Sequence, residues 1–271
     1  MSQPVKDAPP AALSRNDLHC KLGVKEVHKC GNFARNPSRT LIGRFELMTD
    51  EERLRRALKW LDVIAGDIIE LLINDYVFKE VQKIIRFNQR LQQTESIFFE
   101  WMGSVFAHSS AVGVRRQAGL SDRSISLRRL LVELQKYPRL VTREYHKNLY
   151  KNMSTRIQRA ADNAYDTYVG PGRTELDPAR IQEDIDLLSS ASERIRHYTD
   201  RVVAHYDERG LRKPIPTFHD LSNCLLEMDE LVLKYSELMK GEAKITLLPT
   251  FLYDWKSIFQ IPWIGDKPNV R

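Results

Sequence analysis

Apolar residues recur every three or four positions along most of the chain after Met48, which is the period of a helix with one buried face. The clearest run begins at Thr49. Thr49 and Glu52 have the spacing of a capping box, so each side chain can bond the backbone N–H of the other residue. The apolar positions that follow are Leu54, Leu58, Leu61, Ile64, Ile68 and Leu72. This pattern predicts an amphipathic helix that begins directly after Thr49.

The same period, together with residues that start and stop helices, predicts further helices downstream. Asp177 and Pro178 suit an N-cap and a first helical position, and Gly241 suits the end of a helix. No run of alternating polar and apolar residues predicts a strand, and no internal repeat is present. We therefore expect an all-α helical bundle. The expected helices cover about 77–91, 96–118, 127–134, 139–166, 177–206, 217–241 and 249–259.

Residues 1–47 differ from the rest of the chain. They contain Pro4, Pro9, Pro10 and Pro37 and no sustained helical period, which predicts a disordered N-terminal extension in front of a helical domain at 48–271. Two interpretations stay open. The segment is a flexible tail, or it is an upstream extension from a wrongly assigned start codon, with Met48 as the natural start.

Charge and composition narrow the function classes. The chain of 271 residues has a net charge of +6, but residues 1–47 carry 8 basic and 4 acidic side chains, so the helical part is close to balanced. Net charge alone therefore gives no argument for a duplex-DNA binder. No apolar run approaches the ~20 residues of a membrane helix, and the N-terminus has no apolar signal core. We expect a cytoplasmic protein without a membrane partner.

The motifs of several enzyme classes do not occur. There is no Gly-rich phosphate loop, no His-Glu-x-x-His and no Gly-x-Ser-x-Gly. His19, Cys20, His28 and Cys30 lack the spacing of a zinc finger. We therefore predict neither a metal site nor a cofactor. Three cysteines in a chain of this length also argue against a disulfide framework.

The segment 194–207 holds the most informative group of polar residues. His205 lies three residues after Val202, on the apolar side of the predicted helix, and Arg201 lies one turn before it on nearly the same side. Arg196 lies nine residues before His205, about 180° around an unbroken helix. A histidine and an arginine at a helix end can act as an acid/base and a phosphate clamp. The apolar stripe of this helix is predicted to be Ile181, Ile185, Leu188, Ile195, Tyr198 and Val202.

A structural interpretation of the same residues is favoured by spacing alone. Asp200, Arg201 and Asp207 can form local ion pairs, and His205 can interact favourably with the helix C-terminus. A basic stretch at 115–129 likewise suits either a solvated helix face or contacts with phosphate.

The order Arg196-x-x-x-Asp200-Arg201-Val-Val-Ala-His205-Tyr-Asp resembles the signature helix of the HEPN superfamily, and most closely its AbiU-like branch of abortive-infection proteins in bacterial phage defence. The resemblance extends over about Met48 to Trp263 and supports Met48 as the start. Its other parts are 46–60, 96–117, 124–133, 217–238 and 254–263.

This resemblance implies a helical bundle that forms a symmetric homodimer, in which two signature helices build a composite, metal-independent RNase site. The family motif is Arg, four to six residues, then His. His205 matches the histidine, but positions 198–200, where the arginine would lie, hold Tyr198, Thr199 and Asp200. Asp200 matches the polar residue that accompanies the motif. Arg201 is one residue too close to His205 and Arg196 is too far, so Arg201 is the first candidate clamp and Arg196 the second.

The leading hypothesis is a phage-defence protein that acts on RNA as an endoribonuclease, with His205 as general acid/base and Thr199 and Asp200 orienting it or holding the partner helix. The alternative is a non-catalytic dimeric module that binds RNA, a nucleotide or a protein such as an antitoxin or another defence component. The broken motif favours this alternative. A purely structural helical protein is the third interpretation.

Overall fold

The computed structural model describes residues 48–204, 208 and 214–261, and the chain divides between Leu47 and Met48. The extension predicted for 1–47 and His205 both lie outside the described residues. The described part is helical and contains no strand, so it confirms an all-α bundle. Its elements are α2 (Asp50–Phe87), α3 (Gln89–Gln92), α4 (Ile97–Ala118), α5 (Leu127–Lys136), η2 (Pro138–Leu140), α6 (Arg143–Leu149), α7 (Thr155–Val169), α8 (Pro178–Tyr198), η3 (Thr199–Val203), α9 (Phe218–Lys240) and η4 (Trp255–Gln260).

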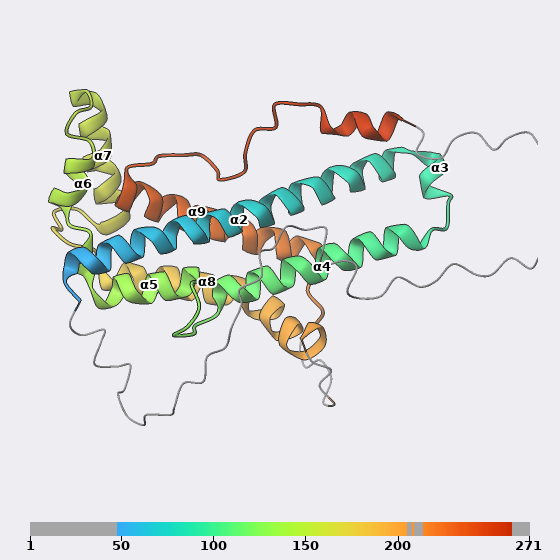
Figure 1. Ribbon diagram of the computed structural model, residues 1–271, viewed down its shortest axis with the longest axis horizontal. Coiled ribbons are helices and arrows are strands. Elements are labelled where there is room, and N and C mark those ends of the chain that lie inside the picture. The colour runs from blue at the N-terminus through green and yellow to red at the C-terminus, as the bar shows by residue number, and fades with distance from the viewer. Residues whose placement is uncertain (1–47, 205–207, 209–213, 262–271) are drawn as a thin grey trace, which may run out of the picture. The chain divides into compact units, whose positions relative to one another are not determined.

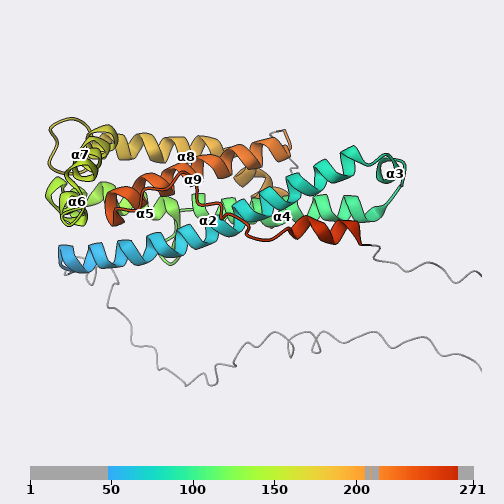
Figure 2. The same cartoon turned by 90° about the horizontal axis from the view of Figure 1, so that it is seen from above.

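The long helices form an up-down-up-down bundle (Figures 1 and 2). Helix α2 runs antiparallel to α5 and α4, which follow each other along it. Arg56 bonds Glu133 near one end, and Arg116 bonds Asp67 further along. Helix α9 runs antiparallel to both α2 and α8, as Lys240–Asp62 and Lys234–Asp184 pairs indicate. Helices α6 and α7 lie together at one end of the bundle, the end where α2 begins.

Helix α2 begins as the sequence predicts and continues further. Thr49 caps it, and both bonds of the capping box with Glu52 are present. The prediction of two helices over 50–91 is wrong, because residues 73–76 contain no glycine or proline and the helix passes through them unbroken to Phe87. Asn88 then ends it, and the Asn88 side chain accepts the first N–H groups of α3.

Two other predicted helices differ from the structure. The helix expected over 139–166 is divided into η2, α6 and α7, because Thr142 caps a new helix and the turn 150–154 separates α6 from α7. In place of the helix expected from Pro249, the structure has the shorter 3₁₀ helix η4. Asp254 is its N-cap and accepts the Lys256 N–H. The segment before it is held to the bundle through Asp229 of α9, which accepts bonds from Thr246 and the Leu247 N–H.

The other predicted helices are confirmed, except that the one expected over 177–206 is an α-helix only as far as Tyr198, and its last residues lie outside the described part. Ser96 caps α4, Asp177 caps α8 with Pro178 at its first position, and Thr217 caps α9. Gly241 ends α9 in the left-handed conformation, at φ +71°. The predicted apolar stripe of α9 is buried at every position, namely Leu221, Leu225, Met228, Leu231, Tyr235 and Leu238.

Helix packing is closest where α4 crosses α2. Gly113 of α4 faces the buried side chain of Leu71, and a methyl group at position 113 would run into both δ-carbons of that leucine. Gly66 of α2, by contrast, is exposed, with nothing within 4 Å of an added Cβ. The two glycines thus serve different purposes, because only Gly113 is needed for the approach of two helices.

We expect opposite effects when the two glycines are replaced by alanine. Gly113→Ala should lower the free energy of unfolding by about 1–3 kcal/mol, because overpacking against Leu71 outweighs the gain in helix propensity. Gly66→Ala should raise the free energy of unfolding by about 0.5–1 kcal/mol, because no contact opposes that gain. Urea unfolding followed by circular dichroism measures both. A stabilised Gly113→Ala would show that α2 and α4 do not pack this closely.

Candidate functional site

The signature segment lies where α8 changes from an α-helix to a π-helix. Helix α8 ends at Tyr198, and the π-helix η3 covers Thr199–Val203, with the Ala204 N–H bonded to the Thr199 carbonyl at 2.8 Å. A π-turn holds one residue more than an α-turn, so it rotates the residues after it by about 100° relative to α8. The half-turn predicted between Arg196 and His205 assumed an unbroken helix. Because His205 lies outside the described residues, that half-turn stays a prediction.

Thr199 anchors this π-helix to α4. The Thr199 side chain is 1% exposed, and its hydroxyl lies 2.7 Å from the Ile195 carbonyl oxygen and 3.2 Å from that of Ala111. The predicted buried stripe of α8 is confirmed through Ile195 and wrong after it: Tyr198 and Val202 are only partly buried. Thr199 takes the buried position because it lies one helical turn after Ile195.

Asp200 and the two candidate arginines lie on this segment in different surroundings. Asp200 is exposed and bonds Arg115 of α4, so its carboxylate faces a cation of the same chain. Such an exposed pair contributes little to stability and can open at low cost. Arg201 and Arg196 are partly buried. The Arg196 carbonyl accepts the Thr199 N–H, and its guanidinium has no hydrogen bond or ion pair with any residue in the described part of the chain.

His108 of α4, which no motif in the sequence marks, lies beside the signature segment. Its Nε2 lies 3.4 Å from the Tyr198 hydroxyl, and the two rings stack with centroids 6.5 Å apart. The Ser104 hydroxyl lies 3.5 Å from Nδ1 on the other side of the ring. His108 is exposed, so it is a titratable group beside the signature segment and a candidate acid or base. Nothing in the local sequence marks it, because Tyr198 is 90 positions away and only folding brings the two together.

A cavity of about 390 Å³ opens beside these residues. It lies between α4, the end of α8 and the beginning of α9. Tyr198 and Phe218 contribute aromatic rings, and most of the remaining lining is aliphatic. The residues that line it are Ala107, Ala111, Tyr198, Ile215, Pro216, Thr217, Phe218 and Leu221.

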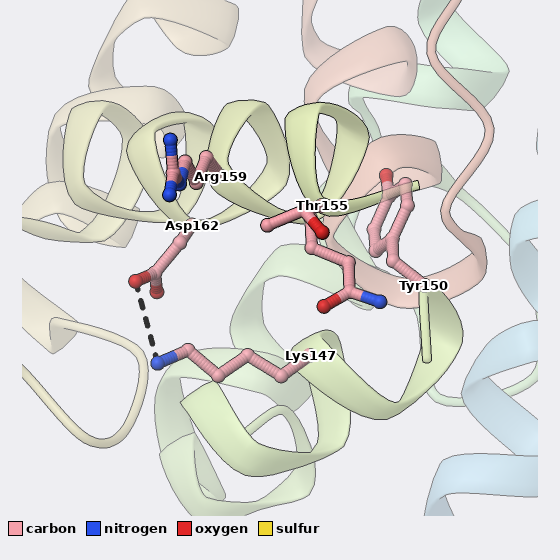
Figure 3. Close-up of a pocket in the computed structure, with 6 residues that line it drawn as sticks. Lys147, Tyr150, Thr155, Arg159 and Asp162 are labelled. Carbon is pink, nitrogen blue, oxygen red and sulfur yellow. Dashed lines mark ion pairs between the residues drawn. The ribbon is translucent and has the colours of Figure 1, made fainter. Parts of the chain in front are cut away.

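A second, more polar cavity of about 250 Å³ lies at the other end of the bundle, between α6 and α7 (Figure 3). Its charged groups are largely paired. Lys147 lies 3.3 Å from Asp162, and Arg143 bonds both Asp162 and Asp166. The hydrogen bond from Arg143 lowers the pKa of Asp166 below its ordinary value. These ion pairs join α6 to α7 and account for Lys147 and Asp162, whereas Arg159 of the same lining has no ion pair with a described residue.

The described residues contain neither a metal-binding cluster nor an exposed thiol. Within them, no group of three His, Cys, Asp or Glu side chains is placed to hold a metal ion. Cys224 is buried in α9, and this burial raises the pKa of its thiol to about 12, so it is not a reactive thiolate. None of the helices described is long and apolar enough to span a membrane.

We expect Thr199→Val to loosen the π-helix from α4. The substitution keeps the side-chain volume and removes a hydroxyl that lies near two carbonyl oxygens, so it should cost about 1–2 kcal/mol. A thermal melt should show a decrease of a few degrees in Tm. Thr167→Val is the matched control, because the Thr167 hydroxyl bonds the carbonyl four residues back but lies exposed on α7. Equal effects of the two variants would contradict an anchoring role of Thr199.

No protein-family model matches the chain, and neither do any of the curated proteins or solved structures compared with it. The resemblance of the segment 194–207 to the HEPN signature helix thus stays a prediction from the residues themselves.

Proposed function

We propose that this protein acts on RNA at the surface formed by the end of α8, η3 and the facing part of α4, as a metal-independent endoribonuclease of the HEPN type in bacterial phage defence. The observation that carries the proposal is the π-helix at Thr199–Val203, immediately before His205. Single π-turns inside long helices occur frequently at functional sites. Here the turn coincides with the segment that resembles the family signature.

The residues of this surface suit cleavage of RNA at a phosphodiester. A general base removes the proton of the ribose 2′-hydroxyl, the 2′-oxygen attacks phosphorus, and the 5′-oxygen leaves with a proton from a general acid. The products are a 2′,3′-cyclic phosphate and a 5′-hydroxyl end. We assign His205 to the proton transfers and Arg201 or Arg196 to the charge on phosphate. His108, beside the Tyr198 hydroxyl, is a further candidate for one of these proton transfers.

Asp200 has a positioning role in this proposal. Its pair with Arg115 lies on the outer side of the contact between the π-helix and α4 in the single chain. In a symmetric homodimer, two such surfaces would meet and each could receive an arginine from the partner. That arrangement would compensate for the arginine that the motif lacks at positions 198–200.

A non-catalytic module is the second candidate function. The observation in its favour is that Asp200 is occupied by Arg115 while no arginine stands at the motif spacing. Such a module would bind RNA, a nucleotide, an antitoxin or another defence protein through the same surface without cleaving RNA.

We expect the full chain to cleave single-stranded RNA in the presence of EDTA. His205→Ala should reduce the rate by about 10²–10⁴-fold, because it removes the general acid/base. One of the two variants Arg201→Ala and Arg196→Ala should reduce the cleavage rate by a comparable factor, because it removes the arginine that stabilises the charge on phosphate. The readout is the appearance of 2′,3′-cyclic phosphate ends on a labelled RNA.

Arg55→Ala is the control, since Arg55 is exposed near the beginning of α2 and should leave the rate unchanged. Circular dichroism shows that each variant is folded. Equal cleavage by wild type and His205→Ala would contradict the assigned role. Binding of RNA without any cleavage would favour the non-catalytic module.

A further inference from the structure

Phe218, the first residue of α9, lies at the junction of two hollows. It lines the apolar cavity beside Tyr198 and also a basic hollow of about 340 Å³ on its other side, between α2 and α9. The ring packs on Phe78 and Phe106, with centroids 4.8 and 5.7 Å away, yet the residue remains 47% exposed. An aromatic ring is thus held rigidly in place and still presented to solvent.

The basic hollow carries a net positive charge. Lys79, Lys83 and Arg86 of α2 line it against one carboxylate, that of Asp75, so its formal charge is +2. Asp75 is satisfied by Lys79 at 2.7 Å and by the Ser222 hydroxyl at 2.6 Å. Among the residues that the structure describes, Lys83 pairs with the neighbouring Glu80, at 2.6 Å.

Arg86 has no ion pair with any residue that the structure describes, and its side chain lies exposed. Lys83 and Arg86 lie three residues apart on one face of α2, which places their side chains about 5–6 Å from each other at the Cβ atoms. Two cations at this spacing can contact neighbouring phosphates of one strand. Lys83 itself is exposed, and if it exchanges Glu80 for a phosphate, the partly buried Glu80 carboxylate keeps its pair with Lys256.

We propose that a single strand of RNA crosses the beginning of α9, with one base in the cavity between Tyr198 and Phe218 and the adjoining phosphates on Lys83 and Arg86. This inference deepens the proposed function and rests on it, because the path begins at Tyr198, next to the π-helix. A base can enter the cavity only when it is unpaired, which selects single strands over duplexes. Stacking on Phe218 tolerates any base, and the cations contact phosphate, so recognition depends little on sequence.

The test measures the binding of a fluorescently labelled, unstructured RNA to the full chain by anisotropy, at several salt concentrations. Phe218→Leu should weaken binding about tenfold, because it removes the stacking ring and keeps an apolar side chain on Phe78 and Phe106. Phe218→Trp restores a stacking surface and should bind like the wild type. This pair separates loss of stacking from loss of folding.

The phosphate contacts are tested with Lys83→Ala/Arg86→Ala. The double variant should bind more weakly, and the slope of log K against log salt should decrease in magnitude by about 1.4, as expected for two lost contacts on a single strand. Arg55→Ala/Lys59→Ala is the matched control, because it removes two exposed cations from the same helix near its other end. The control should retain the wild-type affinity and slope.

The outcomes separate this inference from the proposed function. Three results would each overturn the path across α9. The two double variants could lose the same RNA affinity, Phe218→Leu could bind RNA like the wild type, or duplex RNA could bind as tightly as a single strand. If RNA binding depends on Phe218, Lys83 and Arg86 while His205→Ala cleaves like the wild type, the path stands and the assignment of the active site fails. If cleavage depends on His205 while the Phe218 and Lys83/Arg86 variants bind normally, the active site stands and the path fails.

Discussion

The antiparallel packing of α2 against α5, α4 and α9 is the constraint on which the rest of the structure depends. One face of this 38-residue helix is buried along most of its length, from Ala57 to Val81. Helix α4 approaches it closely at Gly113, where an added methyl group would force the buried Leu71 side chain to shift. The bond between Ser222 and Asp75 sets the position of α2 along α9. Together these contacts bring the beginning of α9 next to the middle of α4, and so create the cavity beside Tyr198.

The region around η3 combines a buried hydrogen bond on its inner side with an exposed ion pair on its outer side. The Thr199 hydroxyl lies against Ala111 of α4 on the inner side, while Asp200 and Arg115 pair on the outer side. The buried contact holds the backbone, whereas the exposed ion pair can exchange partners at little cost. A surface of this kind can rearrange its charges around a bound phosphate or a second chain without disturbing the helix beneath. The proposed RNA site and the proposed path across Phe218 both use this property.

Most of the helices could be predicted from the sequence, because their ends are local features. Thr49 with Glu52, Asp177 with Pro178, and Thr217 with Gly241 each act within a few residues, so their effect can be read from the sequence. The errors occurred where no local signal exists or where distant contacts compete. Residues 73–76 have ordinary helix-forming composition, and only the continuous packing of α2 shows that one helix passes through them. Around Pro249, distant contacts compete with helix formation: Thr246 and Leu247 bond Asp229 before the proline, and Phe251 stacks on Tyr76 after it.

For the candidate site, the sequence by itself determined which residue types occur on the signature segment and that the arginine is absent at the motif spacing. It also determined the apolar stripe of α8 as far as Ile195 and that of α9, since helical periodicity is a property of neighbouring residues. The π-turn at Thr199–Val203, the pairing of Asp200 with Arg115 and the stacking of His108 on Tyr198 were decided only by the tertiary structure. The physical reason is that each depends on how α8 meets α4, and the partners lie about 85–90 positions apart in the chain.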